Sequence, residues 1–189
     1  MNLITEWQWV RSSIDSLEIE IAESKFPYPT QRMCSLLIAG EDHRFYNHPG
    51  VDVVAICRAI WSTYFLGTRQ GGSTIAMQLV RTLTHRYERT VLRKIREIIL
   101  AICITWYVPK RRIPLLYLWC ASYGWKMNNF SEACTRLKLN PKTACIQEEA
   151  ELIARLKYPQ PKELNLERMK TIHRRGLHLI QLLNKRGYS

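Results

Sequence analysis

The sequence predicts a mainly helical protein with a single domain. Apolar residues recur at helical spacing in several long segments, and no run shows the apolar–polar alternation that is typical of strands. Proline and glycine separate these segments, for example at Pro27, Pro29, Gly71 and Gly72. A chain of 189 residues is also long enough to bury a sizeable core.

The expected helices follow one another along the chain. Residues 1–24 form an acidic amphipathic helix that ends before the two prolines, and residues 31–39 form a second helix. Residues 52–66 are apolar and aromatic, and are either a core helix or a segment that dips into a membrane interface. Further helices or apolar segments are expected at residues 74–85, 88–108, 113–120, 143–156 and 166–183. In the last of these we expect the core positions to be Leu177, Ile180 and Leu183.

The chain is strongly basic, with a net charge of +12 and a pI of about 9.7. Such a surface favours anionic partners, such as nucleic acid, an anionic membrane face or a phosphorylated substrate. Residues 1–30 contain no apolar stretch like that of a secretory signal. The longest apolar run, residues 98–108, has about half of the ~20 residues that a membrane-spanning helix needs. We therefore expect no spanning segment or anchor in this chain, although it could lie on a membrane.

Carboxylates and imidazoles gather at the end of the second expected helix. Glu41, Asp42 and His48 follow the apolar run at residues 36–39 and precede the break at Pro49. A packed helix would fix such groups and the following loop would expose them, as a reaction centre requires. A solvated turn is the competing interpretation of this stretch by itself.

A glycine-rich loop precedes the helix expected at residues 74–85. Ser73 is its expected N-cap, and one face of the helix carries Thr74, Gln78, Arg81 and His85. A glycine loop that leads into a helix with a cationic polar face can bind a phosphate group. A face that simply contacts solvent is the alternative.

Glu97 is the last charge before the apolar run of the helix expected at residues 88–108, and it follows clustered basic residues. Its carboxylate could pair with Arg93 one turn earlier, which would be a structural role. A carboxylate at this boundary, beside several arginines, could equally belong to a functional site. The helix pattern does not decide between these two interpretations.

These three stretches, in this order, resemble the family 51 glycosyltransferases, which are the peptidoglycan glycosyltransferase domains of class A penicillin-binding proteins and the monofunctional transglycosylases. Residues 41–52 are similar to E-D-x-x-F-x-x-H-x-G-x-D, residues 71–81 to G-G-S-T-I-T-Q-Q-L-V-K, and residues 93–97 to R-K-x-x-E. The resemblance covers residues 30–185 and leaves residues 1–29 as an N-terminal helical segment. It implies a lysozyme-like helical fold with a small membrane-touching lobe, for which residues 53–66 are the candidate.

The resemblance implies the polymerisation of lipid II. A sugar hydroxyl attacks the anomeric carbon of a growing glycan, and undecaprenyl diphosphate leaves with inversion. Glu41 would be the general base, and Glu97 the second carboxylate, which assists the leaving group directly or through a divalent metal such as Mg or Mn. No organic cofactor is expected. The residues expected to bind the diphosphate or the glycan are Asp42, His48, Ser73, Thr74, Gln78, Arg81, Arg89, Arg93 and Lys94.

The expected partners are lipid II, the nascent glycan strand, a membrane surface and other cell-wall synthesis proteins. Nucleic acid is not expected, because the glycine loop and the acidic motif are both intact. The family implies a peripheral location at the outer, periplasmic face of the bacterial cytoplasmic membrane.

The sequence departs from the family pattern at several positions. Arg81 replaces a lysine, and Ala76 and Met77 replace threonine and glutamine. Pro114 and Trp119 replace a usual leucine and asparagine, so departures fall around residues 114–131, and residues 119–135 are the least family-like part. A second hypothesis therefore stays open, in which a catalytically weakened relative binds lipid II or a cell-wall complex without polymerising. Retention of both carboxylates argues for the active enzyme.

Overall fold

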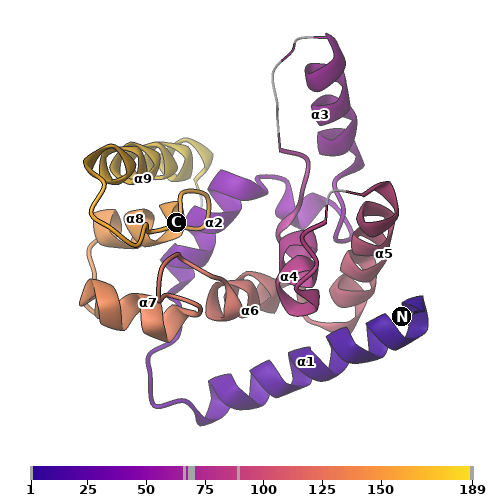
Figure 1. Ribbon diagram of the computed structural model, residues 1–189, viewed down its shortest axis with the longest axis horizontal. Coiled ribbons are helices and arrows are strands. Elements are labelled where there is room, and N and C mark those ends of the chain that lie inside the picture. Colours follow the sequence, from indigo (N-terminus) through magenta and orange to yellow (C-terminus); the bar gives the residue numbers. More distant parts are fainter. Residues whose placement is uncertain (1, 66, 68–70, 89, 188–189) are drawn as a thin grey trace. The chain divides into compact units, whose positions relative to one another are not determined.

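The computed structural model describes residues 2–65, 67, 71–88 and 90–187, and it confirms that the chain is mainly helical (Figure 1). Across these described ranges, β-type pairing is limited to isolated bridges that join Gly124 to Met127 and to Gln160. The chain forms two compact units, Met1–Ser16 with Glu41–Tyr117, and Leu17–Gly40 with Leu118–Ser189. The division expected between residues 29 and 30 stays a prediction.

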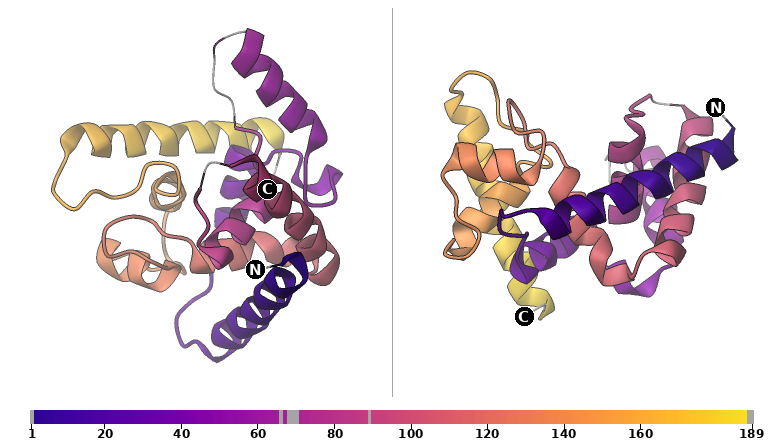
Figure 2. Two further views of the ribbon diagram at one scale, coloured as in Figure 1. Left: turned by 45° about the vertical axis from the view of Figure 1, so that its right-hand side comes forward. Right: turned by 90° about the horizontal axis from the view of Figure 1, so that it is seen from below.

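The first unit contains the start of one long helix, several complete helices and the start of another. These elements are α1 (Leu3–Glu23), η1 (Phe45–Asn47), α3 (Val53–Phe65), α4 (Ile75–Thr84), α5 (Val91–Tyr107), η2 (Lys110–Arg112) and α6 (Ile113–Cys120). Helices α4 and α5 pack against each other, whereas α3 projects away from them (Figures 1 and 2). Gly50, with a φ of +94°, lets the loop before α3 approach the backbone of α5 closely.

Side-chain caps set where α4 and α5 begin. Thr74, rather than the predicted Ser73, is the N-cap of α4, because its hydroxyl accepts a hydrogen bond from the Met77 N–H at 3.3 Å. The same hydroxyl donates to the Gly50 carbonyl at 2.6 Å, which ties the preceding loop to the helix. Thr90 caps α5 in the same way, so this helix begins at Val91 and not at the predicted residue 88.

Helix α3 lies in the segment, residues 52–66, that was expected to be a core helix or to touch a membrane. Its C-terminal end is exposed. The exposed fractions are 60% for Trp61, 81% for Tyr64 and 68% for Phe65, and the Trp61 and Phe65 rings stack at 4.2 Å. This exposure excludes the core-helix alternative for the described end of α3. Over the described ranges, the structure offers no helix with the length and apolar character required to cross a bilayer.

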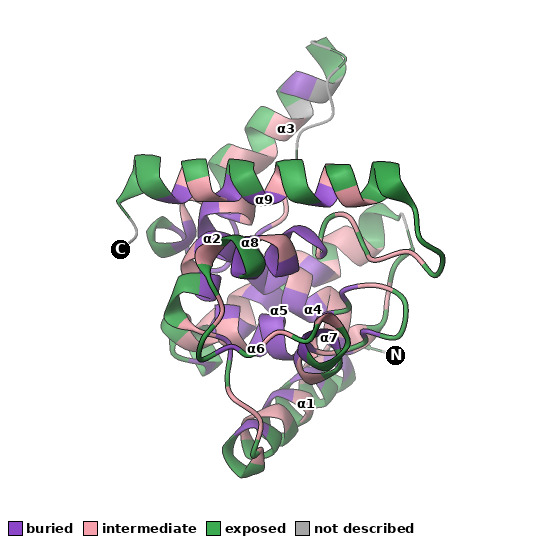
Figure 3. Cartoon of the chain, turned by 90° about the vertical axis from the view of Figure 1, so that its left-hand side faces the viewer, coloured by how far each residue is buried: buried purple, intermediate pink, exposed green. Residues whose placement is uncertain are grey.

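The second unit contains the rest of α1, most of α2 (Gln31–Glu41), the end of α6, and then α7 (Phe130–Leu137), α8 (Ile146–Ala154) and α9 (Leu166–Arg186). Helix α7 was not predicted, and the Asn129 side chain caps its first turn. Helices α8 and α9 pack together, and the buried residues of α9 lie along the side that faces α8 (Figure 3).

The core face of α9 differs in part from the predicted one. Leu183 is buried as expected, but Leu177 is 42% exposed. Gly176 lies on the packed face instead, and a Cβ there would be only 3.2 Å from the Glu151 side chain of α8. A small residue is therefore needed where the two helices approach, and the neighbouring leucine turns outward.

Arginines of α9 bond the last carbonyls of α2. Arg186 Nη1 donates to the Ala39 carbonyl at 2.6 Å, and Arg175 Nη2 donates to the Gly40 carbonyl at 3.0 Å. Carbonyls in the last turn of a helix have no partner within the helix, so these bonds stabilise the helix end. A side chain at residue 40 would clash with Leu179. The backbone is thus fixed immediately before Glu41.

Candidate functional site

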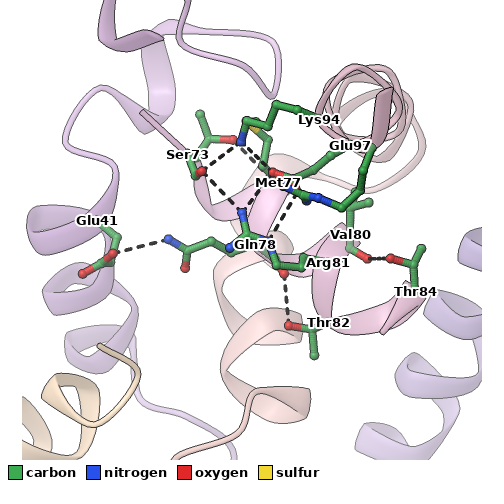
Figure 4. Close-up of polar contacts among 12 residues, drawn as sticks. Glu41, Ser73, Met77, Gln78, Val80, Arg81, Thr82, Thr84, Lys94 and Glu97 are labelled. Atoms are coloured by element: carbon green, nitrogen blue, oxygen red, sulfur yellow. Dashed lines mark hydrogen bonds and ion pairs between the residues drawn. The ribbon is translucent and has the colours of Figure 1, made fainter. Parts of the chain in front are cut away.

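Glu41 is the last residue of α2, and its side chain is half-buried. The Gln78 side chain of α4 donates from Nε2 to Glu41 Oε2 at 3.3 Å (Figure 4). This hydrogen bond orients the Glu41 carboxylate, which is the acceptor. A partly exposed carboxylate at a fixed helix end can accept a proton from a substrate hydroxyl.

Asp42 and His48 are both buried and bond to each other, with 2.9 Å between His48 Nε2 and Asp42 Oδ1. The second oxygen of Asp42 accepts a hydrogen bond from the Ile75 N–H at 3.1 Å, so this carboxylate joins the acidic loop to the start of α4. In this arrangement the Asp42 and His48 side chains stabilise the loop that follows α2. Their contact with substrate stays a prediction.

Lys110 holds the same loop from the other side. Its Nζ donates to the His48 carbonyl and lies 5.3 Å from the centre of the Phe45 ring. Burial lowers the pKa of Lys110, and the negative charge of Asp42 acts in the opposite direction. Glu41 is therefore followed by a loop in which the Asp42 carboxylate and the His48 carbonyl are held by hydrogen bonds.

Glu97 lies at the centre of a cationic cluster formed by α4 and α5 (Figure 4). It is only 2% exposed. Arg81 Nη2 donates to Oε1 at 3.1 Å, Lys94 Nζ donates to Oε1 at 2.8 Å, and Arg93 Nη1 donates to Oε2. Lys94 also donates to the Ser73 hydroxyl at 3.0 Å, which connects the cluster to the loop before α4.

The cluster shows that both interpretations of Glu97 describe part of its surroundings. The pair with Arg93 one turn earlier is present, as the structural interpretation expected. Arg81, however, comes from another helix, and Lys94 adds a third cation. The carboxylate therefore organises basic side chains from two helices and does more than stabilise α5.

The charges fix the protonation state of this cluster. Burial acts to raise the pKa of Glu97, but hydrogen bonds from Arg81 and Lys94 outweigh it and hold the pKa below its ordinary value. Glu97 is therefore ionised at neutral pH and does not donate a proton in this state. Burial also lowers the pKa of Lys94, although the bond to Glu97 acts to raise it.

This arrangement can bind an anion with several charges. Arg81 and Lys94 are 31% and 33% exposed, so both side chains are partly open to solvent while their positions are held by the buried carboxylate. Charge-assisted hydrogen bonds from arginine and lysine suit phosphate groups. Arg81 lies three residues after Gln78 on α4, which is about 4.5 Å along the helix axis. One helix thus carries both the contact to Glu41 and an arginine of the cationic cluster.

The described residues around Glu97 offer few ligands to a divalent metal. The described residues contain no group of three or more histidine, cysteine, aspartate or glutamate side chains that could hold a metal ion. Glu97 already accepts hydrogen bonds from cations, which would repel a metal ion. Mg or Mn at Glu97 stays a prediction.

The structure brings together most of the residues predicted to form the site. Ser73, Gln78, Arg81, Arg93 and Lys94 all lie in the contacts around Glu41 and Glu97, whereas Thr74 is buried as a helix cap. Arg89 lies outside the described residues.

One charged residue near the site was missed. Glu6 of α1 is 2% exposed and pairs with Arg86 at 3.4 Å and with Arg96 at 3.1 Å. The signal was present in the sequence, because Glu6 lies one turn before Val10 and two turns before Ile14 on the apolar face of its helix. A carboxylate on such a face needs a cationic partner.

Comparison with known proteins gives consistent matches. A sequence model of the family described as Transglycosylase matches residues 21–182. The chain is 48% identical over 87 residues to penicillin-binding protein 1A of Escherichia coli (strain K12), and 39% identical over 101 residues to penicillin-binding protein 1B of Haemophilus influenzae. It is 33% identical over 118 residues to a monofunctional glycosyltransferase of Staphylococcus saprophyticus.

These alignments cover 46%, 51% and 61% of this chain. They cover 10%, 13% and 44% of the three relatives, so the chain spans only a minor part of the length of the curated proteins that it matches.

Proposed function

Because this chain belongs to the transglycosylase family, we propose that it is a peptidoglycan glycosyltransferase that polymerises lipid II. In this reaction a sugar hydroxyl forms a bond to the anomeric carbon of the growing glycan, and the bond from that carbon to the diphosphate breaks. The hydroxyl proton must be removed, and negative charge develops on the departing diphosphate. The enzyme therefore needs a base at one position and cations at the other.

The surroundings of Glu41 support its role as the base. It ends a helix whose carbonyls are bonded by α9, and Gln78 orients its carboxylate. The proton of the attacking hydroxyl would pass to Glu41 while the new glycosidic bond forms. This role needs an ionised carboxylate that is partly accessible, and Glu41 is half-buried.

Arg81 and Lys94 are the cations that we assign to the departing diphosphate, and Ser73 lies beside them. Their positive charges would stabilise the charge that develops as the bond to the anomeric carbon breaks, a kind of contact that is worth about 10²–10³ in turnover when one donor is lost. Because Glu97 is ionised, its contribution is to hold these cations in place and not to protonate the leaving group.

The observation that carries the proposal is that α4 links Glu41 through Gln78 and presents Arg81 one turn later (Figure 4). The test incubates purified protein with labelled lipid II and resolves glycan chains on a gel. The wild type is expected to form polymer, and Glu41→Gln to lose about 10²-fold or more of that activity. Glu163→Gln, at an exposed position, is the matched control. Polymerisation by Glu41→Gln at the wild-type rate would refute the base assignment.

The second candidate is a relative that binds lipid II without polymerising it. It is favoured by Trp119, which is 3% exposed, donates to Glu20 at 2.9 Å and stacks with Phe130 at 6.1 Å between ring centres. A residue that differs from the family pattern is therefore part of the core of the second unit. Binding of labelled lipid II by the wild type, without polymer formation, would favour this candidate.

We also propose that the protein works at a membrane surface, on the outer face of the bacterial cytoplasmic membrane, beside other cell-wall synthesis proteins. Exposed aromatic side chains at the end of α3 support the membrane contact, because Trp and Tyr favour the interface. Flotation with anionic vesicles tests it: Trp61→Ser with Tyr64→Ser should reduce the floated fraction. The control changes two exposed leucines of the second unit, Leu164→Ser with Leu166→Ser. Wild-type protein that stays at the bottom of the gradient excludes the contact.

A further inference from the structure

The first part of α1 packs against the two helices that carry the cationic cluster. Trp9 Nε1 donates to the Leu83 carbonyl in the last turn of α4 at 3.1 Å. Near the end of α5, the Tyr107 hydroxyl donates to Asp15 at 2.6 Å, and its ring lies 5.8 Å from that of Trp7 between ring centres. Residues 1–20 lie outside the segment that matches the family, so this contact belongs to a part of the chain that the family pattern does not describe.

Glu6 is the charged residue within this contact. Its two carboxylate oxygens pair with different arginines, Oε1 with Arg86 of the loop after α4 and Oε2 with Arg96 of α5. Its side chain is 2% exposed, so both ion pairs are largely removed from water on the carboxylate side. A buried carboxylate with two cations restricts the positions of both.

The two buried carboxylates share one region of basic side chains. Among the described residues, five cations there pair with either Glu6 or Glu97: Arg81, Arg86, Arg93, Lys94 and Arg96. A small cavity of about 10 Å³ joins the two groups. Its walls include both carboxylates together with Arg81, Arg86 and Arg93. Glu6 of α1 and Glu97 of α5 therefore line the same cavity.

This arrangement divides the arginines between the two carboxylates. Without Glu6, Arg86 would lose its partner while Glu97 remained on the wall of the same cavity. Arg86 would then compete for Glu97, and each bond that it gained would weaken the hold of Glu97 on Arg81. The donors of Arg81 would no longer be fixed toward a ligand.

We infer that Glu6 is a positioning residue: by holding Arg86 and Arg96, it keeps Glu97 paired with the cations that bind the diphosphate. The identity of the ligand as a diphosphate rests on the proposed function, whereas the positioning of Arg81 by Glu6 does not. Glu6 is thus part of the machinery that sets affinity for a diphosphate, and it acts through the cations of the cluster. Glu6→Gln keeps the size of the side chain and removes its charge, so it separates this role from packing.

The first measurement needs no ligand. The NMR signal of the Arg81 Nε–H reports its bond to Glu97, which is 3.3 Å long in this structure. Glu6→Gln is expected to shift or broaden this signal, and Glu6→Asp to restore it in part because the charge returns. Glu23→Gln, at an exposed position of the same helix, is the matched control and should leave the signal unchanged. An unchanged Arg81 signal in folded Glu6→Gln would overturn the inference.

The second measurement is calorimetric binding of inorganic diphosphate to the same folded variants. Glu6→Gln should weaken binding by about 2- to 30-fold, the range of couplings that act through intervening contacts. Tighter binding would show that the added net positive charge matters more than position, and would overturn the inference. Equal binding together with lower thermal stability would make Glu6 a merely structural residue and would also overturn it.

Two outcomes separate this inference from the proposed function. A wild-type protein that bound no diphosphate would count against the proposed function, while the Arg81 signal would still decide the role of Glu6. If Glu6→Gln did not fold, Glu6→Asp would keep the charge but shorten the side chain, which weakens its hold on Arg86 and Arg96. That variant is expected to give a smaller shift of the Arg81 signal, and no shift would refute the inference.

Discussion

Replacing Glu97 by glutamine is the most direct test of the cationic cluster. The substitution keeps the shape of the side chain and removes the negative charge that three described cations share. Arg81, Arg93 and Lys94 would then repel one another without a buried counter-charge. We therefore expect Glu97→Gln to destabilise the fold as well as to weaken anion binding.

The magnitude follows from burial. Breaking a buried ion pair by removing one partner costs about 3–5 kcal/mol. Arg81 and Lys94 are about one third exposed and Arg93 is 16% exposed, so solvent screens part of the lost attraction. We expect a loss of roughly 3 kcal/mol, which corresponds to a decrease of about 6–12 °C in Tm for a domain of this size.

Thermal unfolding followed by circular dichroism at pH 7 measures this loss. Glu163→Gln is the control, because it makes the same chemical change at an exposed position. Lipid II turnover by the same two proteins shows whether the substitution also lowers activity. A Tm for Glu97→Gln within about 1 °C of the control would refute the reasoning, because it would mean that the cations need no buried partner.

Two further predictions concern pH and backbone conformation. Because the folded state holds the pKa of Glu97 below its ordinary value of 4.5, its stabilisation is present above pH 4.5 and is lost as the pH falls through the lower folded value. The Tm difference between wild type and Glu97→Gln should therefore shrink below pH 4.5, and a constant difference would contradict this. Gly50→Ala would place a Cβ 2.5 Å from the Ala101 carbonyl oxygen at a φ of +94°, and should cost roughly 3 kcal/mol in urea unfolding. Gly71→Ala, which meets nothing within 4 Å, should change stability far less, and equal losses would exclude this explanation.

Much of the site could be predicted because its residues are close in sequence or at helical spacing. Gln78 and Arg81 lie one turn apart on α4, and Arg93, Lys94 and Glu97 lie within five residues on α5. Helical geometry alone places such side chains near one another. The sequence did not predict that α4 and α5 pack against each other, and this packing brings Arg81 to Glu97.

The missed features depend on contacts between distant segments. Glu6 meets Arg96 across 90 residues, and the family pattern begins after the part of α1 that carries it. The N-cap of α4 was assigned to Ser73 from residue type, but the bond between Thr74 and the Gly50 carbonyl selects the next residue. In α9, close packing selected Gly176 over Leu177 for the buried face. In each case a tertiary contact decided between options that local sequence allows.

The departure at residue 81 from the lysine of the family pattern agrees with the observed geometry. A guanidinium has five N–H donors in a planar fork, whereas an ammonium acts as a point charge. Arg81 uses Nε and Nη2 to bond both oxygens of Glu97, and Nη2 also reaches Ser73 at 3.5 Å. An arginine can therefore be held by a buried carboxylate and still direct donors toward an anion. A lysine at this position would hold Glu97 through one nitrogen. We therefore interpret Arg81 as a substitution that keeps a cation with several donors at the proposed diphosphate site.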